Sequence, residues 1–552
     1  MKSKIQTVNK KISAVLKDIS AGKYAIPRLQ REFVWDGSRA AKLMDSIYKE
    51  MPIGSVLVWN TPTSKKLFFR EKYNVLPPFN DRNKRVWFLI DGQQRLSVLH
   101  GIYQGMSIPN SKGKEINFRN IVFSLDCKKK EQCFSYRKPQ QGRFVSLNDI
   151  LSPQFKNNFY GLKKSHLKTI KKCRESIFNY KILQVVTSIP SLAEVKECFL
   201  RINTQGIKVS SADAIFSKAQ TLDLRDFVHE TRQKLGEPYK NIDDMPILWT
   251  LIALRGVTYP GKNKIDGVVK EIENEATKNP SVKKNIHKEW SILKECFKKA
   301  VIYLENNFRV INLSYLYSPY MISMLALFYY FNNKHNPDWK QKDQIRKWFW
   351  STTTAGRYSG KAFYKCIVDD ASFFKKLSHN NDSKFKPSEF ADVYDIRKTQ
   401  YNSPSSGMGS AFYCLLLRKK PVSLLDESLN EIPLERYLSQ VSKDRHHIFP
   451  RALLSRAGFQ HSEYNSICNI CLLTSEENKL IGNIRPSHYL KVTKKNRSLF
   501  ARKMSHHIIP FDSKNGLWMK DIKKGFRRFV RERQNLIKQS LEKEAGIRIF
   551  RE

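Results

Sequence analysis

The stretch Leu89-Ile-Asp-Gly-Gln-Gln-Arg-Leu-Ser-Val-Leu-His100 decides the fold of the first part of the chain. An apolar run ends at Ile90, and the Asp-Gly pair that follows it is typical of a tight turn. Beyond the turn, Leu96 and Leu99 recur with helical spacing. We therefore predict a buried strand, a tight turn and the start of a helix here.

This turn has the features of a phosphate cradle. The first backbone N–H groups of a helix have no partner within it, and the helix dipole favours an anion there. Arg95 would add a cation, and Gly92 would allow a ligand close to the backbone. Arg31 and Arg201 could contact further phosphate oxygens. An ordinary tight turn can carry the same short string, so that alternative stays open.

Around this turn, from residue 24 to about 220, short apolar runs alternate with helical segments. The runs rich in β-branched or aromatic residues are predicted strands: Ser55–Trp59, Val86–Ile90, Ile121–Leu125 and Ile182–Val186. From about 221 to 400 the pattern is helical, with helices expected around 222–235, 243–256, 283–306, 319–332 and 339–350. We therefore expect a mixed α/β domain followed by a helical one.

A polar loop with two glycines, residues 401–410 (YNSPSSGMGS), predicts a boundary before a compact C-terminal region. The expected fold is multidomain α+β, with domains at residues 1–220, 221–400 and 401–552. A chain of 552 residues is long enough to build several domains, each with its own core.

The charge of the chain points to its partner. It has 98 Lys and Arg against 51 Asp and Glu, which gives a formal net charge of +47. Such a surface attracts polyanions by counterion release, so nucleic acid is the expected partner, with an anionic membrane surface as second choice. The most apolar stretch, Tyr320–Phe331, is shorter than the ~20 residues of a membrane span and predicts a buried helix instead. We therefore expect no membrane association.

Nine cysteines are scattered along the chain. Their odd number and wide spacing predict no disulfide framework and fit a reducing cytosol. The polar start of the sequence does not have the pattern of a signal peptide. A cytoplasmic location is therefore expected.

Three strings of the first domain occur together: Ile26-Pro-Arg-Leu-Gln-Arg-Glu-Phe-Val-Trp35, the stretch 89–100, and Phe199-Leu-Arg-Ile-Asn-Thr-Gln-Gly206. Together they resemble the N-terminal domain of the GmrSD-like restriction nucleases, which has a ParB/sulfiredoxin-like fold. The resemblance implies a nucleoside triphosphate, GTP rather than ATP, that is bound or hydrolysed in one pocket. The residues implied are Gln30, Arg31, Asp91, Gly92, Gln93, Gln94, Arg95, Arg201, Asn203, Gln205 and Gly206.

The C-terminal region holds a second set of strings, Asp444-Arg-His-His-Ile-Phe-Pro450 and the segment Asn465–Pro486. Cleavage of a phosphodiester with one metal ion needs a base that activates water and a cation that stabilises the leaving oxygen. Adjacent histidines on a strand point to opposite faces, so His446 and His447 can divide these tasks. A neutral imidazole is suited to accept a proton from water near neutral pH.

This second set resembles the HNH nuclease module of the same family, a ββα finger with one divalent cation, Mg²⁺ or Mn²⁺. The resemblance implies that His447 is the general base and that Asn469 ties the loop to it. It also implies that His446 and Asn478 are metal ligands. Many relatives carry Asp at the position of His446. Asp444 could support that ligand from behind.

Three other features of this region are predicted to lie outside the catalytic site. The string His506-His-Ile-Ile-Pro510 has nearly the same spelling as the first histidine pair, but it lacks the spaced asparagines that follow His447. Cys468 and Cys471 form a CxxC without a second pair nearby, so we expect them to be buried rather than zinc ligands. The segment 520–543 predicts an amphipathic helix. Its predicted solvent- or phosphate-facing residues are Arg527, Arg528, Arg531 and Arg533.

The two motif sets in this order resemble the single-chain, modification-dependent (type IV) restriction enzymes. The resemblance implies an NTP-linked, metal-dependent endonuclease that cleaves modified double-stranded phage DNA in bacterial defence and is a possible homo-oligomer. Two alternatives stay open at this point: a DNA-binding ParB-like regulator without nuclease activity, and an RNA-cleaving toxin.

Overall fold

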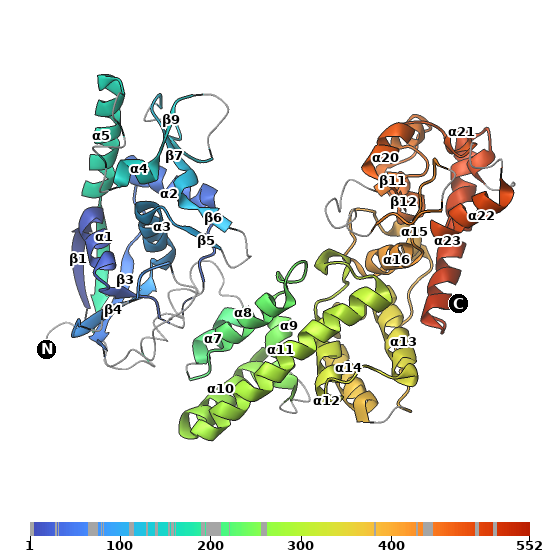
Figure 1. Cartoon of the computed structure of the whole chain (residues 1–552), viewed down its shortest axis with the longest axis horizontal. Helices are drawn as coiled ribbons and strands as arrows, with labels where there is room; N and C mark the ends of the chain where they lie inside the picture. The colour runs from blue at the N-terminus through green and yellow to red at the C-terminus, as the bar shows by residue number, and fades with distance from the viewer. Residues whose placement is uncertain are drawn as a thin grey trace. The chain divides into compact units, whose positions relative to one another are not determined.

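The fold is described from a computed structural model of the whole chain (Figure 1). The structure describes residues 5–551 except 28–29, 31, 64–74, 79, 81, 110–114, 128–130, 138–141, 153–154, 156–158, 160–161, 189–193, 195–210, 220, 255–261, 380–381, 427–428, 434–444, 492–495 and 512–515. The chain forms two compact units. Unit 1 comprises Met1–Asp226 and Val269–Lys283, and unit 2 comprises Phe227–Val268 and Lys284–Glu552. The predicted boundaries near residues 220 and 400 stay predictions.

Unit 1 is built on a mixed five-stranded sheet in the order β1-β10-β3-β4-β2. Its strands are β1 (Ile5–Lys11), β2 (Tyr24–Ala25), β3 (Val56–Pro62), β4 (Arg85–Asp91) and β10 (Lys181–Thr187). β10 runs parallel to β3, and β3 pairs antiparallel with β4 in the register Trp59↔Phe88. Three of the four predicted strands are confirmed here, because β3, β4 and β10 cover them.

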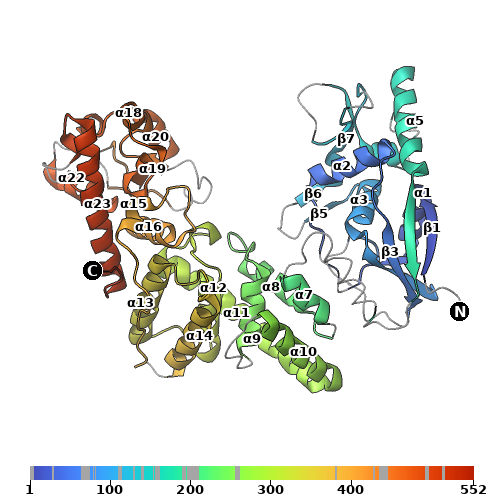
Figure 2. The same ribbon diagram turned by 180° about the vertical axis from the view of Figure 1, so that it is seen from behind.

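Four helices pack with this sheet around one core: α1 (Ile12–Ser20), α2 (Gly37–Tyr48), α3 (Gln93–Gln104) and α5 (Lys164–Asn179). The pattern is clear in α1, where Ile12, Val15, Leu16 and Ile19 recur at helical spacing and are all buried. These helices contact one another beside the sheet (Figures 1 and 2).

A small antiparallel sheet completes the described part of unit 1. Its central strand β7 (Ile121–Ser124), the fourth predicted strand, pairs with β8 (Phe134–Tyr136) and β9 (Phe144–Ser146). A separate hairpin joins β5 (Ser107–Pro109) to β6 (Glu115–Asn117). The short helix α4 (Leu147–Leu151) follows β9, and α7 (Ser211–Lys218) lies later in the unit.

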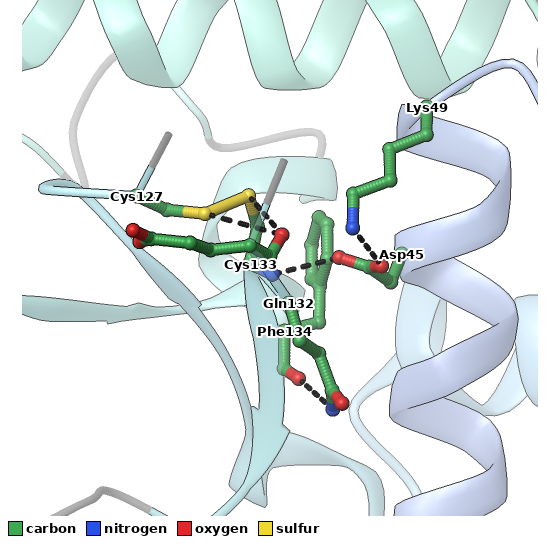
Figure 3. Close-up of a disulfide and its surroundings, with 7 residues drawn as sticks. Asp45, Lys49, Cys127, Gln132, Cys133 and Phe134 are labelled. Atoms are coloured by element: carbon green, nitrogen blue, oxygen red, sulfur yellow. Dashed lines mark hydrogen bonds and ion pairs between the residues drawn. A yellow bond between two sulfur atoms is a disulfide. The ribbon is translucent and has the colours of Figure 1, made fainter. Parts of the chain in front are cut away.

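One pair of cysteines is joined, although the cysteine count predicted no disulfide framework. Cys127 and Cys133 form a disulfide between β7 and β8 (Figure 3). The backbone N–H of Cys133 also donates to the Asp45 carboxylate at 2.7 Å, and Asp45 accepts from Lys49. Because the two cysteines lie only six residues apart, the whole-chain count could not reveal a local loop closure of this kind.

The middle of the chain is helical, as predicted. The helices are α8 (Leu224–Leu235), α9 (Asp244–Leu254), α10 (Lys262–Lys278), α11 (Pro280–Phe308), α12 (Tyr320–Phe331), α13 (Trp339–Ala355) and α14 (Phe363–His379). The apolar helix α12 is buried between α9 and α14, which confirms the prediction of a buried helix. In the described part of the chain, no helix is long and apolar enough to cross a membrane.

In the C-terminal part of unit 2, helices surround a small hairpin. The hairpin strands are β11 (Arg445–His447) and β12 (Ile470–Leu472). The helices are α15 (Tyr394–Lys398), α16 (Gly407–Arg418), α18 (Arg451–Arg456), α19 (His461–Tyr464), α20 (Ser475–Ile481), α21 (Pro486–Tyr489), α22 (Arg497–His506) and α23 (Ile522–Ala545).

Part of the predicted loop at 401–410 is helical. Ser406 caps α16 by accepting from the backbone N–H of Gly409, so the glycines belong to the first turn of this helix. α16 packs on both α13 and α23 (Figure 2). The chain therefore passes residue 400 inside one compact unit.

Candidate active site

The hairpin of β11 and β12 positions the first histidine pair. His446 lies opposite Cys471 and His447 opposite Ile470. Arg533 of α23 fixes this hairpin from behind, because its guanidinium donates to the carbonyl oxygens of Cys468 at 2.9 Å and Ile470 at 2.6 Å. Arg533 is fully buried, so the prediction that it faces solvent or phosphate is wrong. Arg533 lies four residues from both Phe529 and Ile537 and so shares their buried face, but its charge led to its assignment to the solvated face.

His446 contacts the helix that follows the hairpin. Its Nδ1 lies 2.8 Å from Oδ1 of Asn478 in α20. A capping box between Thr474 and Glu477 starts this helix and thereby fixes the position of Asn478. Burial lowers the pKa of His446, and its Nε2 is buried without a hydrogen-bond partner among the described residues. The two predicted metal ligands are therefore brought together.

His447 contacts a different element, as expected for neighbours on a strand. Its Nε2 lies 2.8 Å from Oδ1 of Asn465, and the Asn465 side-chain amide donates to the ring of His461. The ring of Tyr401 stands edge-on to the His447 ring at 5.1 Å. Burial lowers the pKa of His447 to about 4. The imidazole is therefore neutral at physiological pH.

Asn469 connects the segments on either side of the hairpin. It is fully buried, accepts from the backbone N–H of Phe449 at 2.8 Å and donates to the carbonyl oxygens of Phe449 and Tyr464. These bonds hold the backbone just after His447. The side chain thus ties the loop together through backbone groups, whereas Asn465 contacts the imidazole itself.

A pocket of about 460 Å³ lies over these groups. It is lined by Tyr401, Arg445, His446, His447, Pro450, Arg451, Ala452, Asn478, Gly482 and Asn483. Arg451 is exposed and makes the pocket suitable for an anion such as phosphate, whereas Arg445 is buried and donates to the carbonyl oxygen of Tyr401 at 2.7 Å. Asp444, the expected support for His446, lies outside the described residues.

The other histidine pair binds backbone carbonyl oxygens, and only His507 of the two is a core residue. His507 is fully buried with its Nε2 2.8 Å from the carbonyl oxygen of Val422, and His506 Nδ1 lies 2.5 Å from that of Lys419. Cys468 and Cys471 are likewise fully buried and free, as expected.

The Asp-Gly turn of unit 1 has the predicted form. Gly92 ends β4 in the left-handed region at φ 89°, and a Cβ there would lie 2.8 Å from the Val56 side chain, so only glycine fits. Gln30 donates to the carbonyl oxygens of Leu89 and Ile90, and Gln94 binds the backbone of Val34 and Glu32. These two glutamines hold the first motif against the second. The Gln93 side chain is also buried there.

The Arg95 side chain, expected to add a cation for phosphate, is bound to the turn itself. Its guanidinium donates to the carbonyl oxygens of Ile53 at 2.6 Å and Ser55 at 2.8 Å, and to Asp91 at 2.9 Å. The Arg95 side chain is 15% exposed, whereas that of Asp91 is 44% exposed. Arg95 therefore braces the turn in this conformation. The remaining predicted pocket residues, Arg31, Arg201, Asn203, Gln205 and Gly206, lie outside the described residues.

Sequence reasoning missed Asn465, His461 and Tyr401. Asn465 begins the segment 465–486 but was given no role, and Tyr401 belongs to the segment 401–410 that was interpreted as a loop. A sequence signal for Asn465 exists in hindsight, because it lies four residues before Asn469 and four after His461. That spacing places His461 and Asn465 on one side of a helical turn.

Comparison with known proteins agrees with the motifs of unit 1. Residues 12–220 match the family described as GmrSD restriction endonuclease, N-terminal domain. This match supports a GmrSD-like restriction endonuclease family and suggests a nuclease role with DNA as substrate. The chain is also 24% identical over 601 residues to uncharacterized protein MJ0686 of Methanocaldococcus jannaschii. That similarity covers 96% of this chain and 97% of the relative.

Proposed function

We propose that the chain is an NTP-linked, metal-dependent DNA endonuclease of the HNH type that cleaves modified phage DNA in bacterial defence. The main support is the convergence of His446, His447 and Asn478 on one pocket with two arginines. The hairpin, the short helix after it and the buried Asn469 are the parts that an HNH-like site needs. The N-terminal family match supports the restriction role independently.

In this proposal His447 is the general base. The side-chain Oδ1 of Asn465 can only accept a hydrogen bond, so the Nε2 of His447 carries the proton and Nδ1 keeps its lone pair. The bond from Asn465 to His461 supports this orientation of the amide. His447 would accept the proton of the attacking water at Nδ1. Arg451, exposed at the mouth of the pocket, would hold the scissile phosphate.

The residues present fit a weakly held divalent cation. In the described part of the chain, no group of three or more His, Cys, Asp or Glu side chains could hold a metal ion. His446 and Asn478 would therefore be the protein ligands, and the imidazole favours Mn²⁺ over the oxygen-seeking Mg²⁺. When bound, the cation would stabilise charge on the leaving oxygen. Because no carboxylate is among the described residues that line the pocket, we expect tight metal binding only together with DNA.

For unit 1 we propose that the Asp-Gly turn binds a nucleoside triphosphate, with GTP favoured over ATP. α3 begins directly after the Gly92 turn, and a helix N-terminus favours an anion, which supports a phosphate site. The buried glutamines Gln30 and Gln94 make the site rigid.

The test is digestion of plasmids that differ only in their base or backbone modification. The full chain is incubated with Mn²⁺, with and without GTP, and His447→Ala serves as the inactive control. Nicking of one modified plasmid but not of its unmodified counterpart supports the proposal. Salt-sensitive binding without cleavage of any DNA would indicate a regulator instead, and cleavage of RNA alone would indicate a toxin.

A further inference from the structure

A second and larger pocket lies on the other side of the segment that contains Tyr401. Its volume is about 950 Å³, and α15, α19 and α23 form its walls. It is lined by Val393, Tyr394, Arg397, Lys398, Gln400, Phe459, Ser462, Glu463, Ser466, Phe526, Arg527, Val530, Arg531, Gln534 and Asn535. Gln400 lines this pocket, whereas its neighbour Tyr401 lines the pocket with His447.

The walls combine cations with aromatic rings. Arg527 and Arg531 lie one turn apart on α23, and Arg397 faces them from α15. Tyr394 is 56% exposed, although a tyrosine ring normally buries its apolar faces. The carboxylate of Glu463 already accepts from the backbone N–H of Gln460, as part of a helix cap. The net charge of the walls is positive. The Arg397 guanidinium lies 5.1 Å from the centroid of the Tyr394 ring, so a cation and an exposed ring stand together in this wall.

Gln534 also lines the pocket, and its buried side chain indicates that a ligand binds there. The residue is only 6% exposed, and its Oε1 has no hydrogen-bond partner among the described residues. A buried amide oxygen without a partner costs roughly 1–3 kcal/mol. An N–H donor of a ligand would remove this cost. A phosphate could not satisfy this acceptor, but an exocyclic amino group of a base could.

We propose that this pocket binds one nucleotide of the DNA substrate, with its base extruded from the helix. The arginines bind the flanking phosphates, Tyr394 stacks on the base, and Gln534 accepts from the amino group of cytosine, adenine or guanine. A pocket that stacks a ring on a base and also binds its amino group can do so only when the base has left the stack, as in enzymes that act on a single base. This proposal rests on the proposed function in one respect, that DNA is the nucleic acid that the chain binds.

The experiment measures DNA binding by the full chain with His447→Ala, so that no cleavage occurs. The probes are fluorescein-labelled 12-nucleotide oligodeoxycytidine and oligothymidine, because single strands avoid the cost of base extrusion. We compare the double variant Arg527→Ala/Arg531→Ala with Arg528→Ala. Arg528 is the matched control, because it is an exposed arginine on the same helix, pairs with Glu532 and does not line the pocket.

The double variant should lower the affinity at least about tenfold and reduce the slope of log affinity against log salt by about 1 to 2, whereas Arg528→Ala should change neither. Gln534→Met should weaken oligodeoxycytidine binding by about tenfold and oligothymidine binding much less. Circular dichroism checks the folding of Gln534→Met, and the exposed arginines give a readout even if this variant unfolds.

Two results would overturn the proposal. One is equal affinity of the double variant and Arg528→Ala. The other is displacement of bound oligodeoxycytidine by deoxycytidine monophosphate at concentrations below the dissociation constant of the oligonucleotide, because the site would then take a free nucleotide. The nuclease proposal is tested separately by nicking with the wild-type chain. If nicking fails but the variants rank as expected, the pocket proposal stands and the nuclease proposal falls.

Discussion

Two strings of almost identical spelling, His446-His-Ile-Phe-Pro450 and His506-His-Ile-Ile-Pro510, have opposite surroundings in this molecule. The first lies on a strand, and its imidazoles contact the side-chain amides of Asn478 and Asn465 beside a pocket. The second lies at the end of α22, and its imidazoles contact backbone carbonyl oxygens.

The partners of the two histidine pairs distinguish a candidate active site from a structural residue of the core. A polar side chain that ends on backbone carbonyl oxygens satisfies groups left over by the fold, as His507, Arg533 and Arg95 do. A polar side chain that ends on other polar side chains at the edge of a pocket keeps partners that a ligand can replace. The pattern of partners is therefore more informative than the spelling of the string.

The largest expected effect separates the two strings directly. His447→Ala should reduce the rate of DNA cleavage by about 10² to 10⁴-fold, the usual contribution of a positioned base. DNA binding should be unchanged. The measurement is nicking of one susceptible plasmid under single-turnover conditions.

The matched variants are His506→Ala and His507→Ala. Each should cleave normally per folded molecule, although His507→Ala leaves the Val422 carbonyl oxygen without its partner and should be less stable by about 1–3 kcal/mol. Full activity in His447→Ala, or its loss only in the second pair, would reverse the assignment of the two strings.

The next effect concerns the proposed metal ligands. His446→Ala or Asn478→Ala should raise the Mn²⁺ concentration for half-maximal nicking by about tenfold or more, and excess Mn²⁺ should restore part of the activity. His506→Ala is again the control. Because His446 and Asn478 contact each other at 2.8 Å, the double variant should cost less than the sum of the two single changes. Additive effects would mean that they do not share a cation.

Asn465 offers a sharper test of the idea that side-chain partners beside a pocket mark the active site. Asn465→Leu removes the acceptor for His447 Nε2 and should lower the cleavage rate by about 10- to 100-fold without changing the Mn²⁺ requirement. Asn465→Asp keeps an acceptor oxygen and should recover most of the rate. ¹⁵N NMR of the imidazole reports the tautomer, which should change in Asn465→Leu alone. A lower rate with an unchanged tautomer would leave Asn465 as a packing residue only.

Much of the fold follows from the sequence, since all four predicted strands and all five predicted middle helices are confirmed. Periodicity reports burial along one element, so it performs well there. It does not report which distant residue meets a buried polar atom. For this reason the sequence interpretation placed Arg533 in solvent, left Arg95 open to phosphate and omitted Asn465.

Arg95 extends the comparison to unit 1. Arg95→Ala should destabilise this unit by about 1.5–3 kcal/mol, because three hydrogen bonds of a charged group are lost. Asp91→Ala, at a half-exposed carboxylate, should change the stability by less than about 0.5 kcal/mol. If the turn binds GTP, both variants should bind it more weakly, as isothermal titration calorimetry would show. Unchanged GTP binding in folded samples of both would remove the phosphate cradle.

The smallest effect is a dependence of stability on pH at the second histidine pair. Burial lowers the pKa of His507 from 6.5 to about 3 in the folded chain. Below pH 6.5 the unfolded chain therefore binds a proton at His507 that the folded chain does not bind. The contribution of this group to the free energy of unfolding is complete above that pH and is lost as the pH decreases. From pH 7 to pH 5 this group should cost up to about 2 kcal/mol.

His507→Gln can still donate to the Val422 carbonyl oxygen but does not titrate, so hydrogen exchange in α22 should be less sensitive to acid than in the parent. Other titrating groups contribute equally to both chains and cancel in this difference. An identical acid response in the two chains would show that His507 is protonated while folded, which would contradict its assignment as a neutral core residue.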